Sequence, residues 1–325
     1  MKDMNFIDFT ASSDDEGRRL DRILKKIFLN YKVDTNVYRL LRKNLIKVNE
    51  GKAKENIIIH KDDIISIAEF LLRKENHESS DFRESKLPIN TVFKNEHVWV
   101  INKDADIAVQ KSNKNSYSLS DEVLRAFYED PHKEKSLSFK PGPVHRIDKK
   151  TSGLVIFSQS LTGAKWISEN IQNHNIKKTY LAIVSGKLLD KEKWTDYIYE
   201  NDLKDNQFKT VKITGEDKGK KAITNAIPLS YGKFKGKDIT LVEFKIETGR
   251  KHQIRAQSAF HGFPLLGDTA YGEHSYKNHF LHACRLDFPK ENPLSLPDFL
   301  EADIPLSFSN FLEHTLINWN GQLII

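Results

Sequence analysis

The sequence predicts an α+β protein in which a small N-terminal α+β unit precedes a larger domain with a mixed, largely antiparallel sheet. Three observations lead to this prediction. Residues 18–72 contain two helix-like segments followed by short strand-like segments. Residues 73–87 hold few apolar residues and no periodic pattern, which is typical of a linker. Residues 88–325 contain many strand-like segments with helix-like segments between them.

The composition indicates a folded protein outside the membrane and outside the secretory pathway. Of the 325 residues, 38% are hydrophobic and 10% are aromatic, which is enough for a sizeable core. No apolar run approaches the ~20 residues that cross a bilayer, and the N-terminus lacks the apolar stretch of a secretory signal. The single cysteine, Cys284, excludes internal disulfides and a four-cysteine zinc site. We therefore expect a soluble, cytoplasmic protein.

Positive charge is concentrated near the N-terminus. The whole chain has a formal net charge of +6. Between Arg18 and Lys74, however, 15 residues are Lys or Arg and 7 are Asp or Glu, so the rest of the chain is slightly acidic. A basic segment beside a nearly neutral remainder indicates a module that binds a polyanion. A solvated, helix-rich surface would have the same composition and remains the alternative.

The elements of the N-terminal unit follow from its apolar spacing. Residues 18–28 are expected to form a helix because their apolar side chains recur at helical intervals. These side chains are Leu20, Ile23, Leu24 and Ile27. A second helix is expected at 35–43, and strands are expected at 46–49 and 64–70.

The larger domain is predicted to alternate strands with short helices. Its strand-like segments are 98–103, 154–159, 179–186, 239–246 and 279–288. Helix-like segments occur at 120–128 and 162–173. The polar segment 112–141 is expected to be an insertion in this domain.

The first segment whose residues suit catalysis is HRIDKKTSGL, residues 145–154, in a turn-rich region before a predicted strand. Asp148 on such a loop is held rigidly and can still face a cleft. The four basic residues within five positions of it are His145, Arg146, Lys149 and Lys150. They favour an ionised carboxylate suited to nucleophilic or base work, and they attract phosphates. On spacing alone, a capped turn with a salt-bridged aspartate is the alternative.

The second such segment is TGRKHQIRAQ, residues 248–257, which is followed by HGFPLLGD. Flanking glycines frame a short predicted helix at 253–260. Arg250 and His252 near its start are candidates for contact with phosphate or substrate. Arg255 is suited to hold a carboxylate elsewhere in the fold, because a guanidinium can bind one through two parallel hydrogen bonds. A surface helix with solvated cations is the alternative.

These segments resemble motifs of the RluA-type pseudouridine synthases. HRIDKKTSGL resembles the family's H-R-[LI]-D-x-x-T-S-G, and TGRKHQIRAQ with GFPLLGDTAYG resembles its later T-G-R-x-H-Q-I-R and G-D…Y-G motifs. KTYLA, LHA and VINKDADIAVQ resemble its remaining short motifs, in the expected order. The basic unit with RLDRILKK and VYRLLRKN resembles an S4 RNA-binding domain, and this combination is most like the large-subunit ribosomal RNA synthase C and D group.

The resemblance implies a domain organisation and an activity. It implies an N-terminal extension at 1–17, an S4-like domain at 18–72, a linker at 73–87 and a catalytic domain with the pseudouridine synthase fold at 88–325. The implied enzyme isomerises specific uridines in RNA, most plausibly in 23S-type ribosomal RNA. It needs no cofactor and no metal, and it is expected to be a monomer.

Carried over position by position, the resemblance also assigns roles to residues. Asp148 becomes the catalytic aspartate, Arg255 its basic partner, and Tyr180 the residue that stacks on the flipped base near the proton that leaves carbon 5. Arg146 would enter the RNA where the uridine is extruded, and Ile254 with Leu281 would line an apolar wall. The further substrate-binding candidates are His145, Arg250 and His252.

Several questions stay open at this level. The aspartate can attack C1′, remove the ribose 2′-proton to give a glycal, or attack C6 of the base. The substrate can be a transfer RNA instead of ribosomal RNA. The chain can also be a non-catalytic RNA-binding or ribosome-assembly protein that retains the fold.

Overall fold

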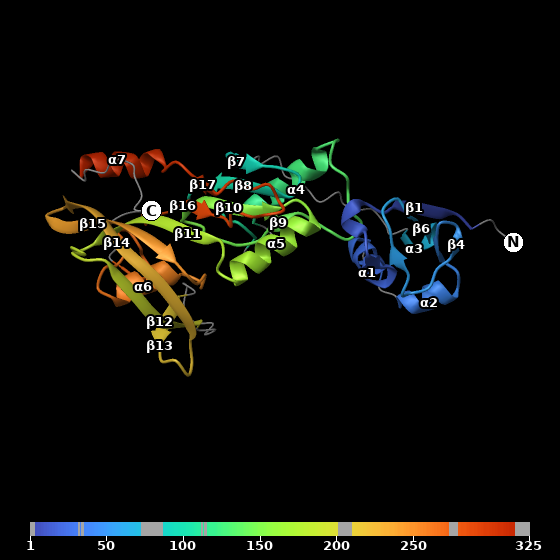
Figure 1. Ribbon diagram of the computed structural model, residues 1–325, viewed down its shortest axis with the longest axis horizontal. Coiled ribbons are helices and arrows are strands. Elements are labelled where there is room, and N and C mark those ends of the chain that lie inside the picture. The colour runs from blue at the N-terminus through green and yellow to red at the C-terminus, as the bar shows by residue number, and fades with distance from the viewer. Residues whose placement is uncertain are drawn as a thin grey trace. The chain divides into compact units, whose positions relative to one another are not determined.

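Figure 1 shows the computed structural model of the protein, which describes residues 4–31, 33, 36–72, 87–111, 113, 116–200, 210–272 and 279–315. The chain divides into two compact units. The first comprises residues up to 87 together with 121–142 and 158–162, and the second comprises the remainder. The predicted linker lies outside the described residues except for Leu87.

The first unit is built on a four-stranded antiparallel sheet. In spatial order its strands are β1 (Phe6–Thr10), β6 (Ile64–Ala68), β3 (Ile46–Val48) and β4 (Gly51–Lys52). A second, smaller pair joins β2 (Arg18–Arg19) to β5 (Ile58–Ile59). The helices of its N-terminal part are the 3-10 helix η1 (Ser13–Asp15), α1 (Leu20–Asn30), α2 (Val37–Arg42) and α3 (Glu69–Leu72). The α+β character predicted for this region is confirmed.

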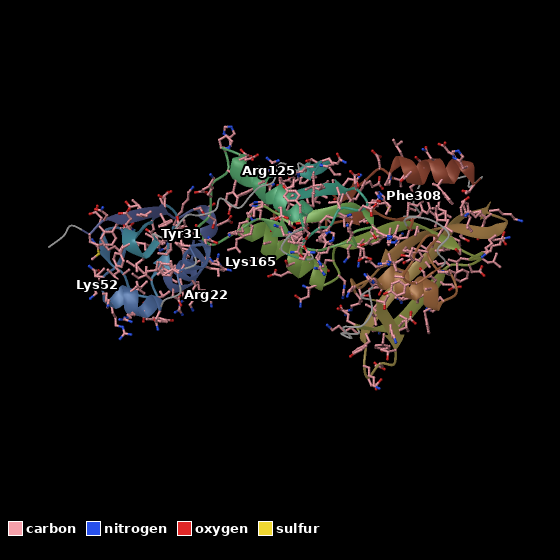
Figure 2. The ribbon with its side chains drawn as sticks, turned by 180° about the vertical axis from the view of Figure 1, so that it is seen from behind. Arg22, Tyr31, Lys52, Arg125, Lys165 and Phe308 are labelled. Atoms are coloured by element: carbon pink, nitrogen blue, oxygen red, sulfur yellow. The ribbon has the colours of Figure 1, made fainter. Side chains whose placement is uncertain are left out.

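Helix α1 forms where the apolar spacing predicts it. Its four predicted core residues are each at most 3% exposed: Leu20, Ile23, Leu24 and Ile27. The basic side chains between them, such as Arg22 in Figure 2, are exposed, whereas Asp21 is 5% exposed and accepts hydrogen bonds from Arg19. Full burial of an apolar side chain of this size stabilises the fold by roughly 1.5–3 kcal/mol. Helix α1 therefore contributes one part of the core of the first unit, and α2 and the strands contribute the rest.

Several details of the first unit differ from the sequence prediction. The helix predicted at 18–28 runs from Leu20 to Asn30, and its first two predicted residues form strand β2. The strand predicted at 64–70 ends at Ala68, where helix α3 follows. Residues 6–10, predicted to belong to an extension, form strand β1 and pair with β6 along its whole length. Helix α2 begins at Val37, two residues later than predicted, because the Asn36 side chain accepts hydrogen bonds from the backbone of its first turn. Residue 35 lies outside the described residues. The predicted domain boundaries remain a prediction.

A buried carboxylate joins the N-terminal loop of the first unit to a later polar segment of the chain. Asp15 is fully buried, and its oxygens accept hydrogen bonds from the backbone nitrogens of Ser12 (3.0 Å), Leu137 (3.0 Å) and Ser138 (3.1 Å). The hydroxyl of Ser136 adds a further bond of 2.9 Å. Burial raises the pKa of Asp15, but the bonds from Ser138, Leu137 and Ser12 together hold it below its ordinary value.

The second unit is built on an eleven-stranded sheet that follows the path β13-β12-β14-β15-β11-β16-β10-β8-β7. Strand β17 pairs with β16, and β9 pairs with β10. In chain order the strands are β7 (Thr91–Lys94), β8 (Val98–Lys103), β9 (Gly142–Pro143), β10 (Ser152–Ser158), β11 (Lys177–Ser185), β12 (Glu192–Glu200), β13 (Val211–Thr214), β14 (Lys220–Phe234), β15 (Lys237–Ile246), β16 (Leu281–Asp287) and β17 (Phe299–Glu301). Strands β10 and β16 pair in parallel, whereas β11, β12, β14 and β15 pair antiparallel with their neighbours. The predicted largely antiparallel sheet is confirmed.

The helices lie close to their predicted positions. Helix α6 (Gln253–Phe260) has the predicted bounds, and α4 (Leu119–Glu129) and α5 (Leu161–Gln172) differ from them by one residue at each end. A last helix, α7 (Leu306–His314), follows β17. In the described part of the chain, no helix has the length and apolar character needed to cross a membrane.

The two faces of the central strand β11 are covered by different helices (Figure 1). Because side chains alternate along a strand, Tyr180 and Ala182 point to one face and Leu181 to the other. Tyr180 and Ala182 share a buried cluster with Ile254 of α6, and Leu181 shares another with Phe308 of α7. The face that carries Tyr180 is the one on which the candidate site lies.

Candidate active site

An inner pocket and an outer groove meet beside the loop that precedes β10. The inner pocket has a volume of about 60 Å³ and the groove about 1010 Å³. The residues that line both are Arg146, Ile147, Asp148, Tyr180, Ile246, Arg250 and His252. Of the nine site residues predicted from the sequence, eight line the inner pocket, whereas His145 lines only the groove.

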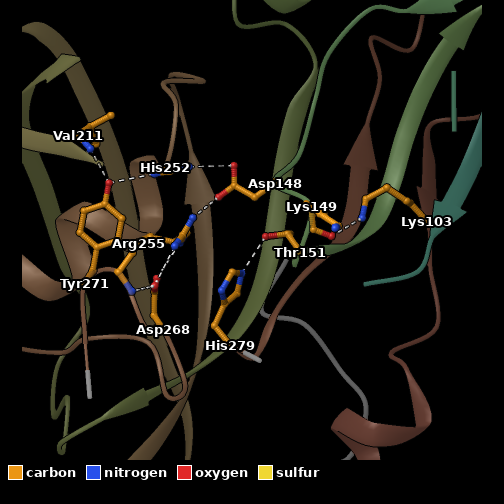
Figure 3. A network of polar contacts seen from close by, with 11 residues as sticks. Lys103, Asp148, Lys149, Thr151, Val211, His252, Arg255, Asp268, Tyr271 and His279 are labelled. Carbon is orange, nitrogen blue, oxygen red and sulfur yellow. Dashed lines mark hydrogen bonds and ion pairs between the residues drawn. The ribbon is translucent and has the colours of Figure 1, made fainter. Parts of the chain in front are cut away.

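Arg255 connects the two predicted motifs by binding the carboxylate of Asp148. Its Nη1 donates a hydrogen bond of 2.8 Å to Asp148 Oδ2, between residues 107 positions apart in the chain (Figure 3). The Arg255 side chain is 10% exposed, whereas that of Asp148 is 26% exposed and faces the pocket. The arrangement therefore fixes one oxygen edge of the carboxylate and leaves the group open to a ligand.

A second carboxylate fixes Arg255 in place. Asp268 accepts two bonds from the guanidinium, 2.7 Å from Nε and 2.8 Å from Nη2, and the backbone nitrogen of Ala270 donates to the same carboxylate. Asp268 is 1% exposed. Burial by itself would lower the pKa of Arg255, but Asp268 and then Asp148 raise it, so the guanidinium stays charged. Burial would raise the pKa of Asp268, but the bond and charge of Arg255 hold it below its ordinary value.

The loop before α6 is shaped by the side chain of Gln253. Its Oε1 accepts bonds from Thr248 Oγ1 (2.8 Å) and from the backbone nitrogen of Arg250 (3.0 Å). Its Nε2 donates to the carbonyl of Ile223 at 3.0 Å. Next to it, His252 adopts a left-handed backbone conformation with φ of 52°, which brings its ring to the pocket. This network fixes the start of α6, two residues before Arg255.

The ion pair between Arg255 and Asp148 is the one that the resemblance implied, whereas in the described part of the chain none of the four basic residues next to Asp148 in sequence forms an ion pair with it. Within the described residues, its ion pairs run to Arg255 and, at 3.7 Å, to His252 Nε2, instead of to the four flanking basic residues. His145 does not add positive charge, because burial and then the nearby Lys178 lower its pKa to about 3. The ring instead accepts a hydrogen bond of 3.1 Å from the backbone of Ile156. Proximity in the chain is therefore a poor guide to which cation contacts this carboxylate.

The two aromatic groups near Asp148 have different surroundings. Tyr180 is 8% exposed, and burial followed by the charge of Asp148 raises the pKa of its phenol. Tyr271, which the sequence analysis did not single out, has its hydroxyl 3.0 Å from His252 Nδ1 and accepts a bond from the backbone of Val211. Its ring also lies 5.2 Å from the guanidinium carbon of Arg255. Asp268 and Tyr271 both belong to the quoted GFPLLGDTAYG motif, which is the signal that could have found them.

Lys103, at the end of β8, is hydrogen-bonded to the backbone of the loop that carries Asp148. It is 1% exposed, and its Nζ donates to the carbonyl oxygens of Asp104 (2.7 Å) and Lys149 (3.1 Å). Burial lowers the pKa of Lys103 to about 7, against the smaller opposing effects of three aspartates. A buried ammonium is costly unless it is hydrogen-bonded, so its contribution here is to fix the backbone next to Asp148.

The other side of the loop is fixed by close packing against β16. Gly153 has φ of 112°, and a Cβ built there would lie 2.3 Å from the carbonyl oxygen of Ala283. Only glycine fits both conditions. Ser152 Oγ lies 2.9 Å from His282 Nδ1, and Thr151 Oγ1 lies 3.1 Å from His279 Nε2. The T-S-G part of the motif is therefore held next to Asp148 by close packing and by hydrogen bonds to two histidines.

This fold and site match a known class of enzyme. Residues 97–260, about half of the chain, match the family of RNA pseudouridylate synthases. The chain belongs to this family and is an isomerase that converts uridine to pseudouridine in RNA. Two solved human structures share the fold, RNA pseudouridylate synthase domain containing 1 (TM-score 0.53, 21% identity) and domain containing 4 (TM-score 0.57, 20% identity). They cover 71% of this chain and 95% and 94% of their own chains, respectively.

Bacterial relatives align with nearly the whole chain. An uncharacterized RNA pseudouridine synthase of Bacillus subtilis is 28% identical over 96% of this chain and 98% of its own. The ribosomal large subunit pseudouridine synthase C of Rickettsia typhi is 28% identical, covering 90% and 96%. The synthase D of Buchnera aphidicola is 26% identical, covering 94% and 91%. The predicted resemblance to the C and D group is confirmed.

Proposed function

We propose that this enzyme isomerises specific uridines of large-subunit ribosomal RNA, with Asp148 as its catalytic aspartate. The observation that carries the proposal is the geometry of Asp148, a partly open carboxylate held by a guanidinium that a second, buried carboxylate fixes in place. The relatives named as large-subunit synthases C and D support the choice of RNA.

The reaction moves the glycosidic bond from nitrogen to carbon. The bond between N1 of uracil and C1′ of ribose breaks, the base turns, and C5 bonds to C1′. The proton on C5 leaves, and N1 takes up a proton. Product and substrate have the same atoms, so the step needs no oxidant or reductant. Asp148 can serve by attacking C1′, by removing the 2′-proton to give a glycal, or by adding to C6. In each case Arg255 holds the carboxylate in one orientation.

The uridine must leave its strand to reach Asp148. Extruding a base costs a few kcal/mol, which stacking and an inserted side chain offset. Tyr180, which lines the pocket, is proposed to stack on the base, and the buried Ile254 and Leu281 are proposed as its apolar wall. Arg146 at the exposed rim is the group that would fill the gap in the RNA.

The first unit is proposed to act as an S4-like RNA-binding domain. The exposed residues Arg22, Lys25 and Lys26 lie on one helix, α1. Such side chains bind phosphates and supply affinity and orientation more than choice of base. The enzyme is proposed to act as a monomer in the cytoplasm.

The test is pseudouridine mapping on defined RNA. Purified enzyme is incubated with transcripts of large-subunit ribosomal RNA and of transfer RNA from the same organism, and pseudouridine is mapped in each. We expect modification at discrete uridines of the ribosomal transcript. Modification confined to transfer RNA would contradict the proposed substrate and favour the tRNA alternative.

A variant separates catalysis from a non-catalytic role. Asp148→Asn keeps the shape of the side chain and removes its charge, so it is expected to fold and to lose pseudouridine formation by roughly 10³-fold or more. Turnover close to wild type from this variant would contradict the assignment. Full complementation of a deletion strain by the inactive variant would favour the ribosome-assembly alternative.

A further inference from the structure

Lys178 faces the outer groove from the same wall as Tyr180. Residues two apart in a strand lie on one face, roughly 7 Å from each other. Lys178 pairs with Ile246 of β15 and Tyr180 pairs with Phe244, without a break in this ladder. Ile246, like Tyr180, lines both cavities, whereas Lys178 lines the groove only. The lysine is therefore the next side chain outward from the tyrosine that meets the uridine.

The position of the Lys178 ammonium is set by the loop before α6. A Cβ built at Gly249 would lie 3.0 Å from Lys178 Nζ, which is closer than a comfortable contact. Glycine at this position therefore leaves room for the ammonium beside the backbone of the loop. Gly249 and Arg250 line the same groove, so the lysine head is held between two elements of the site.

The ammonium of Lys178 has no anionic partner among the residues that the structure describes. Burial lowers its pKa, and no acid nearby counters this effect. Five Lys and Arg side chains line the groove against two carboxylates. Both carboxylates are taken, since Asp148 binds Arg255 and Glu200 lies 3.8 Å from Lys251. A partly desolvated cation without a counter-charge is costly, and an anionic ligand would offset that cost.

We propose that Lys178 binds a backbone phosphate of the RNA strand beside the extruded uridine. The inference rests on the proposed function, because the phosphate belongs to the substrate RNA. An ammonium contacts a phosphate as a point charge and tolerates several strand geometries. Lys178 thus contributes to holding the strand while Tyr180 and Asp148 meet the nucleoside. It is a substrate-binding residue and takes no part in bond breaking.

The matched control is Lys177, the preceding residue on the same strand. Its side chain is exposed, points to the opposite face of β11 and donates to the carbonyl of His174. Lys177→Met removes the same charge a few ångströms from the groove. Lys178→Met and Lys178→Arg complete the set, since arginine restores the charge and methionine retains the stem.

The experiment measures the dissociation constant for the ribosomal transcript as a function of salt, together with the single-turnover rate at saturating enzyme. At ~0.15 M salt we expect Lys178→Met to weaken binding about tenfold, and the slope of log Kd against log salt to fall by about 0.7. The saturated rate should stay within about threefold of wild type. Lys178→Arg should restore the slope, and Lys177→Met should leave it unchanged.

Three results would overturn the proposal. They are an unchanged salt slope in Lys178→Met, an equal loss in Lys177→Met, and a lost saturated rate with unchanged binding, which would mean a structural role in the pocket. Circular dichroism and thermal unfolding confirm that each variant is folded. Because binding is measured without turnover, failure of wild type to form pseudouridine would count against the proposed function and not against this contact.

Discussion

The carboxylates of Asp15 and Asp148 have different surroundings, and we propose that they have different roles. Asp15 is fully buried and surrounded by neutral donors from serine hydroxyls and backbone nitrogens. Asp148 is partly open to a cavity and bound by one charged partner. In Asp15, both carboxylate oxygens accept hydrogen bonds from the protein and are buried, so a ligand cannot reach them. The second arrangement leaves carboxylate oxygens accessible from the pocket, which suits the catalytic role that we propose for Asp148.

Among the substitutions that test this comparison, Arg255→Ala is expected to have the largest effect on activity and stability. Arg255→Ala leaves Asp148 without its partner and the buried Asp268 with an uncompensated charge. We expect pseudouridine formation to fall by roughly 10²-fold or more and the free energy of unfolding to fall by about 3–5 kcal/mol. Tritium release from RNA labelled at uridine C5 and urea denaturation measure the two effects. Stability equal to wild type would show that the Arg255–Asp268 pair is not the anchor described.

Altering Asp15 should change stability and leave the chemistry intact. Asp15→Asn places an amide where several donors converge, so we expect the free energy of unfolding to fall by about 2–4 kcal/mol. At a temperature where the variant is folded, the saturated single-turnover rate should match wild type. A lost rate in folded protein would mean that Asp15 is not purely structural.

The lowered pKa of Asp15 also predicts how the stability of the protein changes with pH. The folded-state pKa of Asp15 lies below its ordinary value of 3.8, so the folded state binds fewer protons than the unfolded one. Its stabilising contribution is therefore present above about pH 4 and is lost as pH falls through the folded-state pKa. Asp15→Asn should show a shallower loss of stability on acidification below pH 4 than wild type.

A smaller effect is expected at Lys103, which braces the loop of Asp148. Lys103→Met keeps the volume but leaves the carbonyls of Asp104 and Lys149 without their donor, so stability should fall by about 1–3 kcal/mol and the rate by roughly tenfold. Because its folded-state pKa is lowered to about 7 from 10.5, wild-type stability should rise with pH between those values. The variant should lack this rise, and a persisting rise would assign it to another group.

The fold was predictable from the sequence because its elements carry local signals. Strand β8 and helix α6 have the predicted bounds, since apolar periodicity and flanking glycines define them without help from the rest of the chain. Strand β1 was missed because its short pattern gains meaning only when β6 lies beside it. The spacing of residues in the sequence does not show which distant strands pair with each other.

The site was predictable only in part. Spacing placed four cations around Asp148, but the cation that binds it comes from 107 positions away. The residue type and position of Arg255 indicated that it holds a distant carboxylate, and only the resemblance to known enzymes named Asp148 as that carboxylate. Asp268, Lys103 and Lys178 all lie in quoted motifs, but no role was assigned to them. Their roles depend on contacts with distant parts of the chain, which the motifs by themselves do not show.

The most direct test of the account is a crossed measurement on Asp148→Asn and Asp15→Asn, in which urea denaturation and the saturated single-turnover rate are determined for both. The account predicts that Asp148→Asn unfolds within about 1 kcal/mol of wild type and is inactive, while Asp15→Asn is destabilised and fully active when folded. Activity in folded Asp148→Asn would contradict it, whatever the stability of either variant.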